Sequence, residues 1–274
     1  YIDDWGNART NRGWRVQHSS SLGPFGGPMH FGRHVTEDLL RAQSFDATFA
    51  NALTGRRLGG AAGGANFEPA LASEAEIQRF CQSFMTELQR HIGPNSDVPA
   101  GDIGVGGREI GYMFGMYRKL RNDFEAGVLT GKGLDYGGSL IRPEATGYGC
   151  VYFAEEMLNH KGDSMKGKTV AISGSGNVAQ FAAEKCIQLG AKVVTMSDSK
   201  GTIHDPEGIT AEKLAYIMDL KNVQRGRISE YASAYSSATF MEGQRPWGVS
   251  VDVALPCATQ NELDGNEANT LLAN

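Results

Sequence analysis

The 274-residue sequence lacks several features that define whole classes of protein. No apolar run approaches the roughly 18 residues that a membrane-spanning helix needs. The formal net charge is −5, so the basic excess that holds a nucleic-acid backbone is missing. The first residues, Tyr1–Asp4, carry two acids and do not resemble a signal peptide. We therefore expect a chain that contacts neither a membrane nor nucleic acid.

Disulfide and metal-ligand patterns are also missing. His30 and His34 are four residues apart, but no carboxylate frame accompanies them, so we expect no metal site. Four cysteines lie far from one another and are interpreted as reduced thiols of a cytoplasmic protein. These are Cys81, Cys150, Cys186 and Cys257. Lysine is absent before Lys119, so the cations of that stretch are arginines, which do not deprotonate usefully.

What the sequence has in excess is glycine, at 36 of 274 residues, about twice the average usage. The glycines are clustered, which indicates local backbone demands rather than low complexity. Hydrophobic residues make up 41%, which is typical of a globular chain, and the length suits two domains.

Periodicity predicts most of the elements. Residues 1–70 look irregular, apart from a strand at 13–18 and a helix at 36–53. Ser73 and Glu76 form an S-x-x-E capping box before a helix with one apolar face. Residues 98–107 look like a glycine-rich loop. Further helices are expected at 108–120, 143–159, 179–189, 210–222 and 228–235, and strands at 168–173, 192–196 and 251–255.

The clearest signal is a strand–turn–helix–strand unit around Gly174-x-Gly176-x-x-Ala179. The first glycine permits the tight turn, the second lets the backbone approach a pyrophosphate, and the small third residue allows close packing. An acid, Asp198, ends the second strand, as in dinucleotide-binding units. The alternative is an ordinary turn that merely needs small residues. Asp198 favours NAD, whereas Ser199 beside it suits a 2′-phosphate, so NAD and NADP both stay open.

A second candidate is Asp102, flanked by Gly101 and Gly104 in a backbone that can approach a ligand. The alternative role for Asp102 is an Asx-type turn. Cys257 has no adjacent base, so a packed thiol is the better interpretation than a nucleophile.

Five segments carry a family resemblance. They are Gln82–Leu88, Pro99–Ile110, Gly138–Gly149, Ser173–Ala179 and Leu255–Glu262. Together they resemble hexameric glutamate dehydrogenases of the NADP-preferring type, continuously from about residue 73 to the end and in degraded form before it. The resemblance implies an α/β fold, with a substrate domain over residues 1–137 followed by a Rossmann-type NAD(P)-binding domain over residues 138–274. It also implies a chain that is shortened at both ends, with its nucleotide domain incomplete at the C-terminus.

The resemblance also implies the site residues. Asp102 matches the acid that shuttles protons to and from the amino group, and Gly101 matches a backbone contact to substrate. The cofactor residues implied by the resemblance or the fingerprint are Thr146, Ser173, Gly174, Ser175, Gly176, Asn177, Val178, Asp198, Ser199 and Asn261. The implied partners are L-glutamate or 2-oxoglutarate with ammonium, and the implied cofactor is NADP, with NAD possible. The family forms homohexamers, so the resemblance implies a homohexamer, although a shortened chain is less suited to form one.

The pattern breaks where family members carry a glutamine and three lysines that hold the substrate carboxylates and activate water. This chain has Gly26, Ala47, Ala50 and Ala62 there. A dicarboxylate needs fixed cations in a dry cleft, and alanine supplies neither a charge nor a titratable amine. We therefore expect an impaired glutamate dehydrogenase-like oxidoreductase. The alternative is a non-catalytic relative or remnant that binds dinucleotide or assembles with active subunits. A related dehydrogenase with an apolar pocket is less well supported, because such enzymes also retain the lysine that Ala62 replaces.

Overall fold

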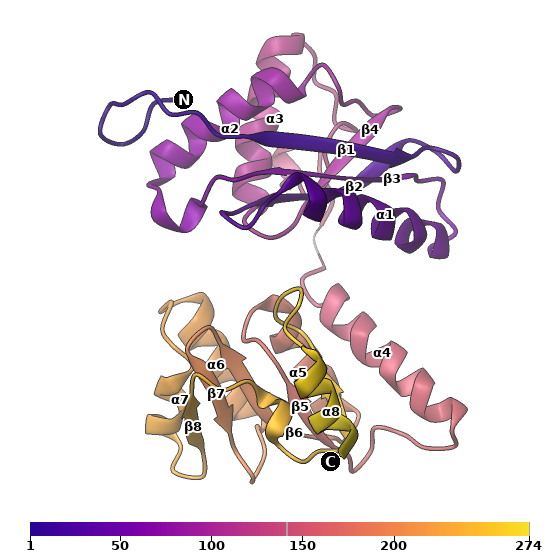
Figure 1. Ribbon diagram of the computed structural model, residues 1–274, viewed down its shortest axis with the longest axis vertical. Coiled ribbons are helices and arrows are strands. Elements are labelled where there is room, and N and C mark those ends of the chain that lie inside the picture. The colour runs from indigo at the N-terminus through magenta and orange to yellow at the C-terminus, as the bar shows by residue number, and fades with distance from the viewer. Residues whose placement is uncertain (141, 274) are drawn as a thin grey trace. The chain divides into compact units, whose positions relative to one another are not determined.

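The computed structural model describes residues 1–140 and 142–273 and forms two compact units, Tyr1–Ile141 and Arg142–Asn274 (Figure 1). Two residues named in the sequence analysis lie outside the described part: Ile141, within the Gly138–Gly149 motif, and the terminal Asn274. Both units are mixed α/β, as the sequence predicts. No helix in the described ranges is long and apolar enough to cross a membrane.

The first unit is built on a four-stranded sheet with the order β1-β3-β2-β4. Strand β2 runs parallel to both β3 and β4, and β1 is antiparallel to β3. The carboxyl ends of three parallel strands therefore meet at one edge. The strands are β1 (Gly13–Ser19), β2 (Phe25–Phe31), β3 (Gly60–Ala65) and β4 (Asp97–Gly101).

Three of these strands correct the sequence-based expectation. Residues 1–70 are not irregular, because they contain β2 and β3, and residues 98–107 are not simply a loop, because they begin within β4. The physical reason is close approach. A Cβ at Gly60 would overlap Thr48 of the helix above, and one at Gly27 would overlap the carbonyl of Ala61 in the neighbouring strand. Glycine is disfavoured in isolated strands but permits this packing.

Helices cover both faces of this sheet (Figure 1). Helices α2 and α3 pack over a core that includes Met29, Phe31 and Ile110, all at most 1% exposed. Helix α1 covers the opposite face with a smaller buried cluster of Val35, Leu40 and Ala62. The helices are α1 (Glu37–Leu53), α2 (Glu74–Leu88) and α3 (Gly107–Arg121).

The capping box at α2 forms only in part. The Ser73 side chain accepts a hydrogen bond from the Glu76 N–H, as predicted. The reciprocal bond is absent, because Glu76 Oε2 accepts from the Asp4 N–H and the Ser73 N–H donates to Asp4 Oδ2. A segment about 70 residues earlier in the chain thus completes the helix end, which local spacing does not reveal.

The second unit contains a five-stranded sheet with the order β8-β7-β6-β5-β9. Strands β6, β5 and β9 are parallel, and β7 and β8 extend the sheet in antiparallel fashion. The strands are β5 (Thr169–Ile172), β6 (Lys192–Asp198), β7 (Gly201–His204), β8 (Thr239–Glu242) and β9 (Val253–Leu255). The helices are α4 (Ala145–His160), α5 (Asn177–Gln188), α6 (Ala211–Asn222), α7 (Ser229–Ala234) and α8 (Gly265–Ala273).

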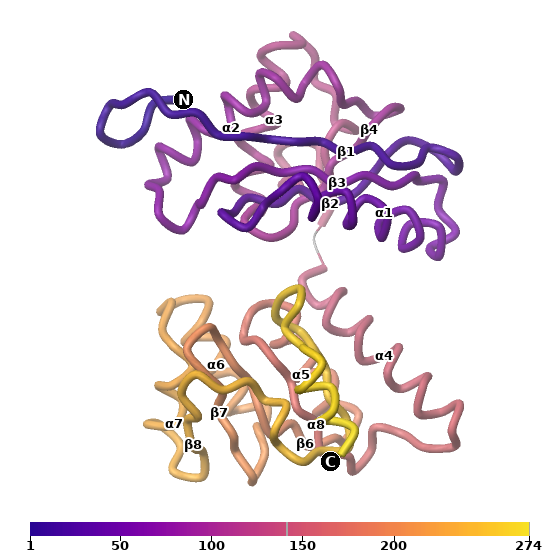
Figure 2. Tube along the Cα trace, in the orientation of Figure 1, coloured from indigo at the N-terminus to yellow at the C-terminus, as the bar shows by residue number. Residues whose placement is uncertain are grey.

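The predicted β5–α5–β6 unit is present, and its path can be followed in the tube of Figure 2. Helix α4 packs closely on α5, because a Cβ at Gly147 would lie 2.6 Å from both the Val178 oxygen and the Ala182 nitrogen. Strands β7 and β8, which are four residues each, were not expected from the sequence. They place an antiparallel edge beside the parallel strands that carry the fingerprint turn.

Candidate functional site

The strand order places the fingerprint turn at a topological switch point. Strand β5 lies between β6 and β9, and all three are parallel. The turn that begins at Gly174 follows β5, and the segment that begins at Pro256 follows β9. In open α/β sheets, ligands bind outside the carboxyl ends of the strands where the order reverses. The two segments lie where the fold favours a ligand.

Gly174 is required by both conformation and space. Its φ is +83°, which side chains rarely adopt, and a Cβ would lie 3.0 Å from the Cys257 carbonyl oxygen. Its N–H donates to Ser197 Oγ at 2.8 Å, and its carbonyl accepts from the Ser197 N–H at 3.0 Å. The turn is therefore fixed between the ends of β6 and β9.

Gly176 differs from Gly174, because a Cβ built there meets no atom within 4 Å. It is the exposed N-cap residue of α5, with extended backbone angles. The first N–H groups of a helix lack partners within the helix and attract anions. Open space in front of this helix end fits a pyrophosphate, so the residues present suit a dinucleotide.

Three predicted cofactor residues in and beside the turn are buried or partly buried. Ser173 is buried, and its Oγ accepts from the Cys257 N–H at 2.9 Å. The carbonyl of buried Ser175 accepts from Gln180 Nε2 at 2.8 Å. Val178 is partly buried in the first turn of α5. In this structure the side chain of Ser173 supports the turn rather than projecting from it.

Three other predicted cofactor residues, Asn177, Thr146 and Asn261, are exposed. Asn177 Nδ2 donates to the Pro143 carbonyl at 2.7 Å, which connects the start of α5 to the segment before α4. Thr146 lies in the first turn of α4, three residues beyond Pro143. Asn261 has a positive φ of 57° in the segment after β9.

Asp198 ends β6, as expected, but its carboxylate is already engaged. Oδ1 accepts from the Lys200 N–H at 2.9 Å, and Oδ2 accepts from the Ile228 N–H at 3.0 Å, with Lys221 Nζ at 3.5 Å. Burial raises the pKa of Asp198, but these bonds outweigh it and hold the pKa below its usual range. Ser199 is exposed, and its Oγ accepts from the Arg227 guanidinium at 3.3 Å.

In the first unit, Asp102 directly follows Gly101 at the end of β4 and opens a tight turn. Its carbonyl accepts from the Val105 N–H at 2.8 Å, and Gly104 has a φ of +71°. A Cβ at Gly104 would overlap the carbonyl of Phe31 at the end of β2, so the turn is fastened to that strand. The Asp102 side chain remains 48% exposed.

The side chain of Asp102 does not make an Asx-type turn. Its Oδ1 accepts from the adjacent Ile103 N–H at 2.9 Å instead of from the residue two places on. Its Oδ2 lies 3.2 Å from Nε2 of His30, which is buried at the end of β2. The sequence does not reveal this pairing, since 72 residues separate the two, and there His30 stands out only as a potential metal ligand.

The four positions where the resemblance implies a glutamine and three lysines lie within the layer formed by α1, β2 and β3. Gly26 is buried in β2, and Ala62 is 0% exposed in β3. Ala47 and Ala50 lie on α1 and are partly buried and exposed, respectively. Arg15, one of the arginines of this unit, is already paired with buried Asp97 at 2.5 Å.

Two thiols that are distant in sequence come together in the second unit. A hydrogen bond with Cys257 lowers the pKa of Cys150 to about 7, against the opposing effect of burial. Burial instead raises the pKa of Cys81 to about 12, and that of Cys186 to about 12. All four cysteines are free.

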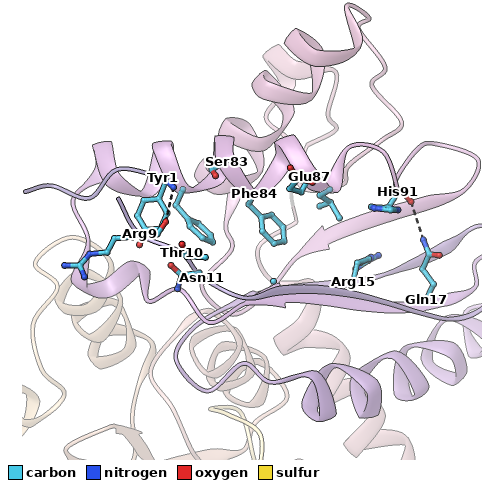
Figure 3. A pocket seen from close by; sticks show the side chains of 13 residues that line it. Tyr1, Arg9, Thr10, Asn11, Arg15, Gln17, Ser83, Phe84, Glu87 and His91 are labelled. Carbon is cyan, nitrogen blue, oxygen red and sulfur yellow. Dashed lines mark hydrogen bonds between the residues drawn. The ribbon is translucent and has the colours of Figure 1, made fainter. Parts of the chain in front are cut away.

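The first unit also contains a cavity of about 660 Å³ between β1 and α2 (Figure 3). Arg15, Phe84 and His91 are among its lining residues. None of the predicted site residues, all of which the structure describes, lines this cavity. It is therefore separate from the acidic turn of the same unit.

Family models match two segments of the chain. Residues 1–119 match the Glu/Leu/Phe/Val dehydrogenase dimerisation domain, and residues 137–274 match Glutamate/Leucine/Phenylalanine/Valine dehydrogenase. Among curated proteins, the chain is 59% identical to the NAD(P)-specific glutamate dehydrogenase of Xylanibacter ruminicola. It is 56% identical to the NADP-specific glutamate dehydrogenase of Haemophilus influenzae. Each match covers 100% of this chain and 61% of the relative.

Solved structures show the same likeness. Plasmodium falciparum glutamate dehydrogenase matches with a TM-score of 0.94 and 48% identity, over 100% of this chain and 58% of that one. Plasmodium falciparum glutamate dehydrogenase 2 matches with a TM-score of 0.87 and 53% identity, over 100% and 60%. The chain thus spans about three fifths of the length of these relatives.

Proposed function

Because the chain belongs to the Glu/Leu/Phe/Val dehydrogenase family, we propose that it is a glutamate dehydrogenase-like oxidoreductase that uses NADP and accepts NAD. The reaction is L-glutamate, NADP⁺ and water to 2-oxoglutarate, ammonia, NADPH and a proton. Residues 1–137 act as the substrate domain and residues 138–274 as the nucleotide-binding domain. Relatives named as NADP-specific and NAD-specific glutamate dehydrogenases support this assignment.

The observation that carries the proposal is the fingerprint turn at the switch point of the second sheet. Gly174 closes the turn, and Gly176 leaves the N-terminus of α5 open to a phosphate. When bound, the nicotinamide cofactor supplies the hydride acceptor. Thr146, Asn177 and Asn261, all three of them exposed, are the side chains that we propose contact it.

The surroundings of Asp198 favour NADP over NAD. The carboxylate that would otherwise bind ribose hydroxyls is held by two backbone N–H groups and Lys221. Ser199 is exposed beside Arg227, and Lys200 follows it. A guanidinium with a hydroxyl matches the geometry of a 2′-phosphate.

We propose that Asp102 carries the proton transfer in the substrate domain and that turnover is slow. Losing a positioned acid–base group costs about 10²–10⁴ in rate. Losing a hydrogen bond to a charged group costs about 1.5–3 kcal/mol each. With three lysines replaced, we expect turnover at least about 10⁴-fold below that of an intact relative, even though such residues act as a unit and their effects do not simply add.

A specific observation favours the second candidate, a relative that binds dinucleotide or joins active subunits without turnover. Ala62 is packed with Val35 and Leu40, so no amine occupies that position. Lys132 is buried, with its Nζ bonded to the Leu129 carbonyl, and burial lowers its pKa. The Lys132 amine is therefore bonded inside the fold and does not replace the missing lysine side chain.

One experiment separates the candidates. NADPH binding is measured by the fluorescence of the nicotinamide, and turnover by NADPH oxidation with 2-oxoglutarate and ammonium. The matched variant restores the family pattern with Gly26→Lys, Ala47→Gln, Ala50→Lys and Ala62→Lys, and circular dichroism checks its fold. We expect binding in both proteins and a large gain of turnover in the restored one. Binding without turnover in either supports the second candidate, and absence of binding refutes both.

A further inference from the structure

The pairing of His30 with Asp102 combines a buried ring with an exposed acid. His30 is 1% exposed, whereas the Asp102 side chain is 48% exposed. Nε2 of His30 lies 3.2 Å from Oδ2 of Asp102, although the N–H is not aligned as a hydrogen bond. One partner can therefore meet a ligand while the other is screened from water.

The sheet register explains how the two residues meet. Met29 of β2 pairs with Gly101, the last residue of β4, and the next residues along the chain are His30 and Asp102. Met29 and Phe31 point into the core under α2 and α3, so His30, between them, points to the opposite face, under α1. Gln43 of α1 lies there, with its Nε2 3.4 Å from His30 Nδ1.

Two polar atoms in this cluster lack partners. Among the described residues, the buried side-chain atoms without a hydrogen bond are His30 Nε2 and Gln43 Oε1. Rotating the Gln43 amide, whose oxygen and nitrogen are interchangeable in shape, lets Oε1 accept from Nδ1–H of His30. Nε2 then becomes an acceptor that faces Asp102. His30 Nε2 and Gln43 Oε1 both have partners in that arrangement when Asp102 carries a proton, and the Gln43 NH₂ group takes the unpartnered place that Oε1 held.

We propose that His30 is a positioning residue that receives and returns the proton handled by Asp102. The inference rests on the proposed function, in which Asp102 takes a proton from the substrate's nitrogen. In the first step an N–H bond of the substrate breaks and an O–H bond forms on Asp102. In the second step the Oδ2–H bond breaks and an Nε2–H bond forms on His30, which leaves an imidazolium beside a carboxylate. The reverse direction returns the proton, and no oxidant or reductant is consumed.

The groups around the imidazole allow this exchange. From the β4 side the facing group is Asp102, the acidic side chain that lies within 4 Å of its nitrogens in the described part of the chain. From α1 the facing group is the neutral Gln43. From β3 the register partner is Gly64, which offers only backbone. A single carboxylate therefore faces the ring.

The first test is spectroscopic and needs no turnover. The full chain is labelled with ¹⁵N-histidine, and the two ring-nitrogen shifts of His30 are compared between the parent protein and Asp102→Asn. We expect these shifts to change in Asp102→Asn and not in Asp38→Asn, an exposed control on α1. The other five histidines serve as internal references. Identical His30 shifts in the parent and Asp102→Asn would overturn the proposal, whatever the enzymatic activity.

The second test uses the variant with the restored lysines. His30→Leu should lower kcat about 10²-fold, the cost of displacing a reacting group by about 1 Å, while the KM for glutamate changes little. His30→Gln, which can donate and accept, should recover part of the loss and guards against a folding defect in the leucine variant. NADPH affinity should be unchanged in both. Equal kcat for the leucine variant and its parent would overturn the proposal, whereas loss of NADPH binding in the parent would overturn the proposed function instead.

Discussion

Substituting Gly176 tests whether the start of α5 holds a phosphate. Gly176→Val adds a branched side chain at a position where a Cβ meets no protein atom. Its backbone angles, φ −84° and ψ −167°, are extended and open to valine. The fold should therefore persist, with a loss of at most about 1 kcal/mol from the poorer N-cap. Only a ligand approaching the helix end would meet the new side chain.

The expected loss of affinity follows from the bonds displaced. A phosphate against the first turn of α5 accepts hydrogen bonds from backbone N–H groups, each worth about 1.5–3 kcal/mol because the acceptor is charged. Losing two at the lower figure costs about 3 kcal/mol, which corresponds to about a 10²-fold weaker Kd. NADPH titration followed by fluorescence measures this directly.

The matched control is Gly115→Val. Gly115 lies in α3 of the other unit, is exposed, and likewise has no atom within 4 Å of a built Cβ. It should leave the NADPH Kd unchanged. If Gly176→Val is folded and binds NADPH within about twofold of the parent, the phosphate does not lie at this helix end, and the assignment of the fingerprint is wrong.

Three further predictions concern other groups. Because Cys257 lowers the pKa of Cys150 to about 7, iodoacetamide should label Cys150 increasingly from pH 6 to 8, as measured by mass spectrometry. In Cys257→Ala this rise in labelling should move to higher pH. Burial raises the pKa of Asp205, but hydrogen bonds, first from Lys213 Nζ at 2.7 Å, lower it overall. The ionised carboxylate should therefore stabilise the folded protein above the unfolded pKa of the group. This stabilisation should be lost as the pH falls through the lower pKa of the folded state. Urea unfolding should show that Asp205→Asn costs about 3 kcal/mol at pH 7, and that this difference shrinks in acid. Ala62→Lys alone should destabilise by about 1–3 kcal/mol in urea unfolding, because the site is fully packed, and should recover little turnover.

The nucleotide half was predictable because its information is local. The strand at β5, the glycines at 174 and 176 and the acid at the end of β6 occur within one βαβ unit. Each residue type is demanded by its own backbone position, as the φ of +83° at Gly174 shows. Such demands appear directly in sequence spacing.

The sheet of the first unit was less accessible, because tertiary contacts override propensity there. Gly60–Ala65 contains only glycine and alanine, residues that are depleted in strands. It is a strand because α1 and β1 press against it, and Gly60 leaves the space that Thr48 fills. A local pattern cannot report which helix will lie over it.

Side-chain partners were the least predictable feature. Asp198 lies where the pattern placed it, yet its carboxylate is held by the N–H of Ile228, 30 residues later. His30 and Asp102 meet only because β2 and β4 are register partners. These contacts decide whether an acid is free to bind a ligand, and they exist only once the strands are paired.

The contacts that hold each candidate site lie within a single unit, and this determines which properties a substitution should change. The fingerprint turn is held by bonds from Ser197 and Cys257, all within the second unit. The acidic turn is fastened to Phe31 and faces His30, both within the first unit. Residues without shared partners have nearly additive effects on stability and binding. Under the proposed function, the absence of lysine at Gly26, Ala50 and Ala62 should therefore leave NADPH affinity intact, whereas turnover should respond to a substitution in either half.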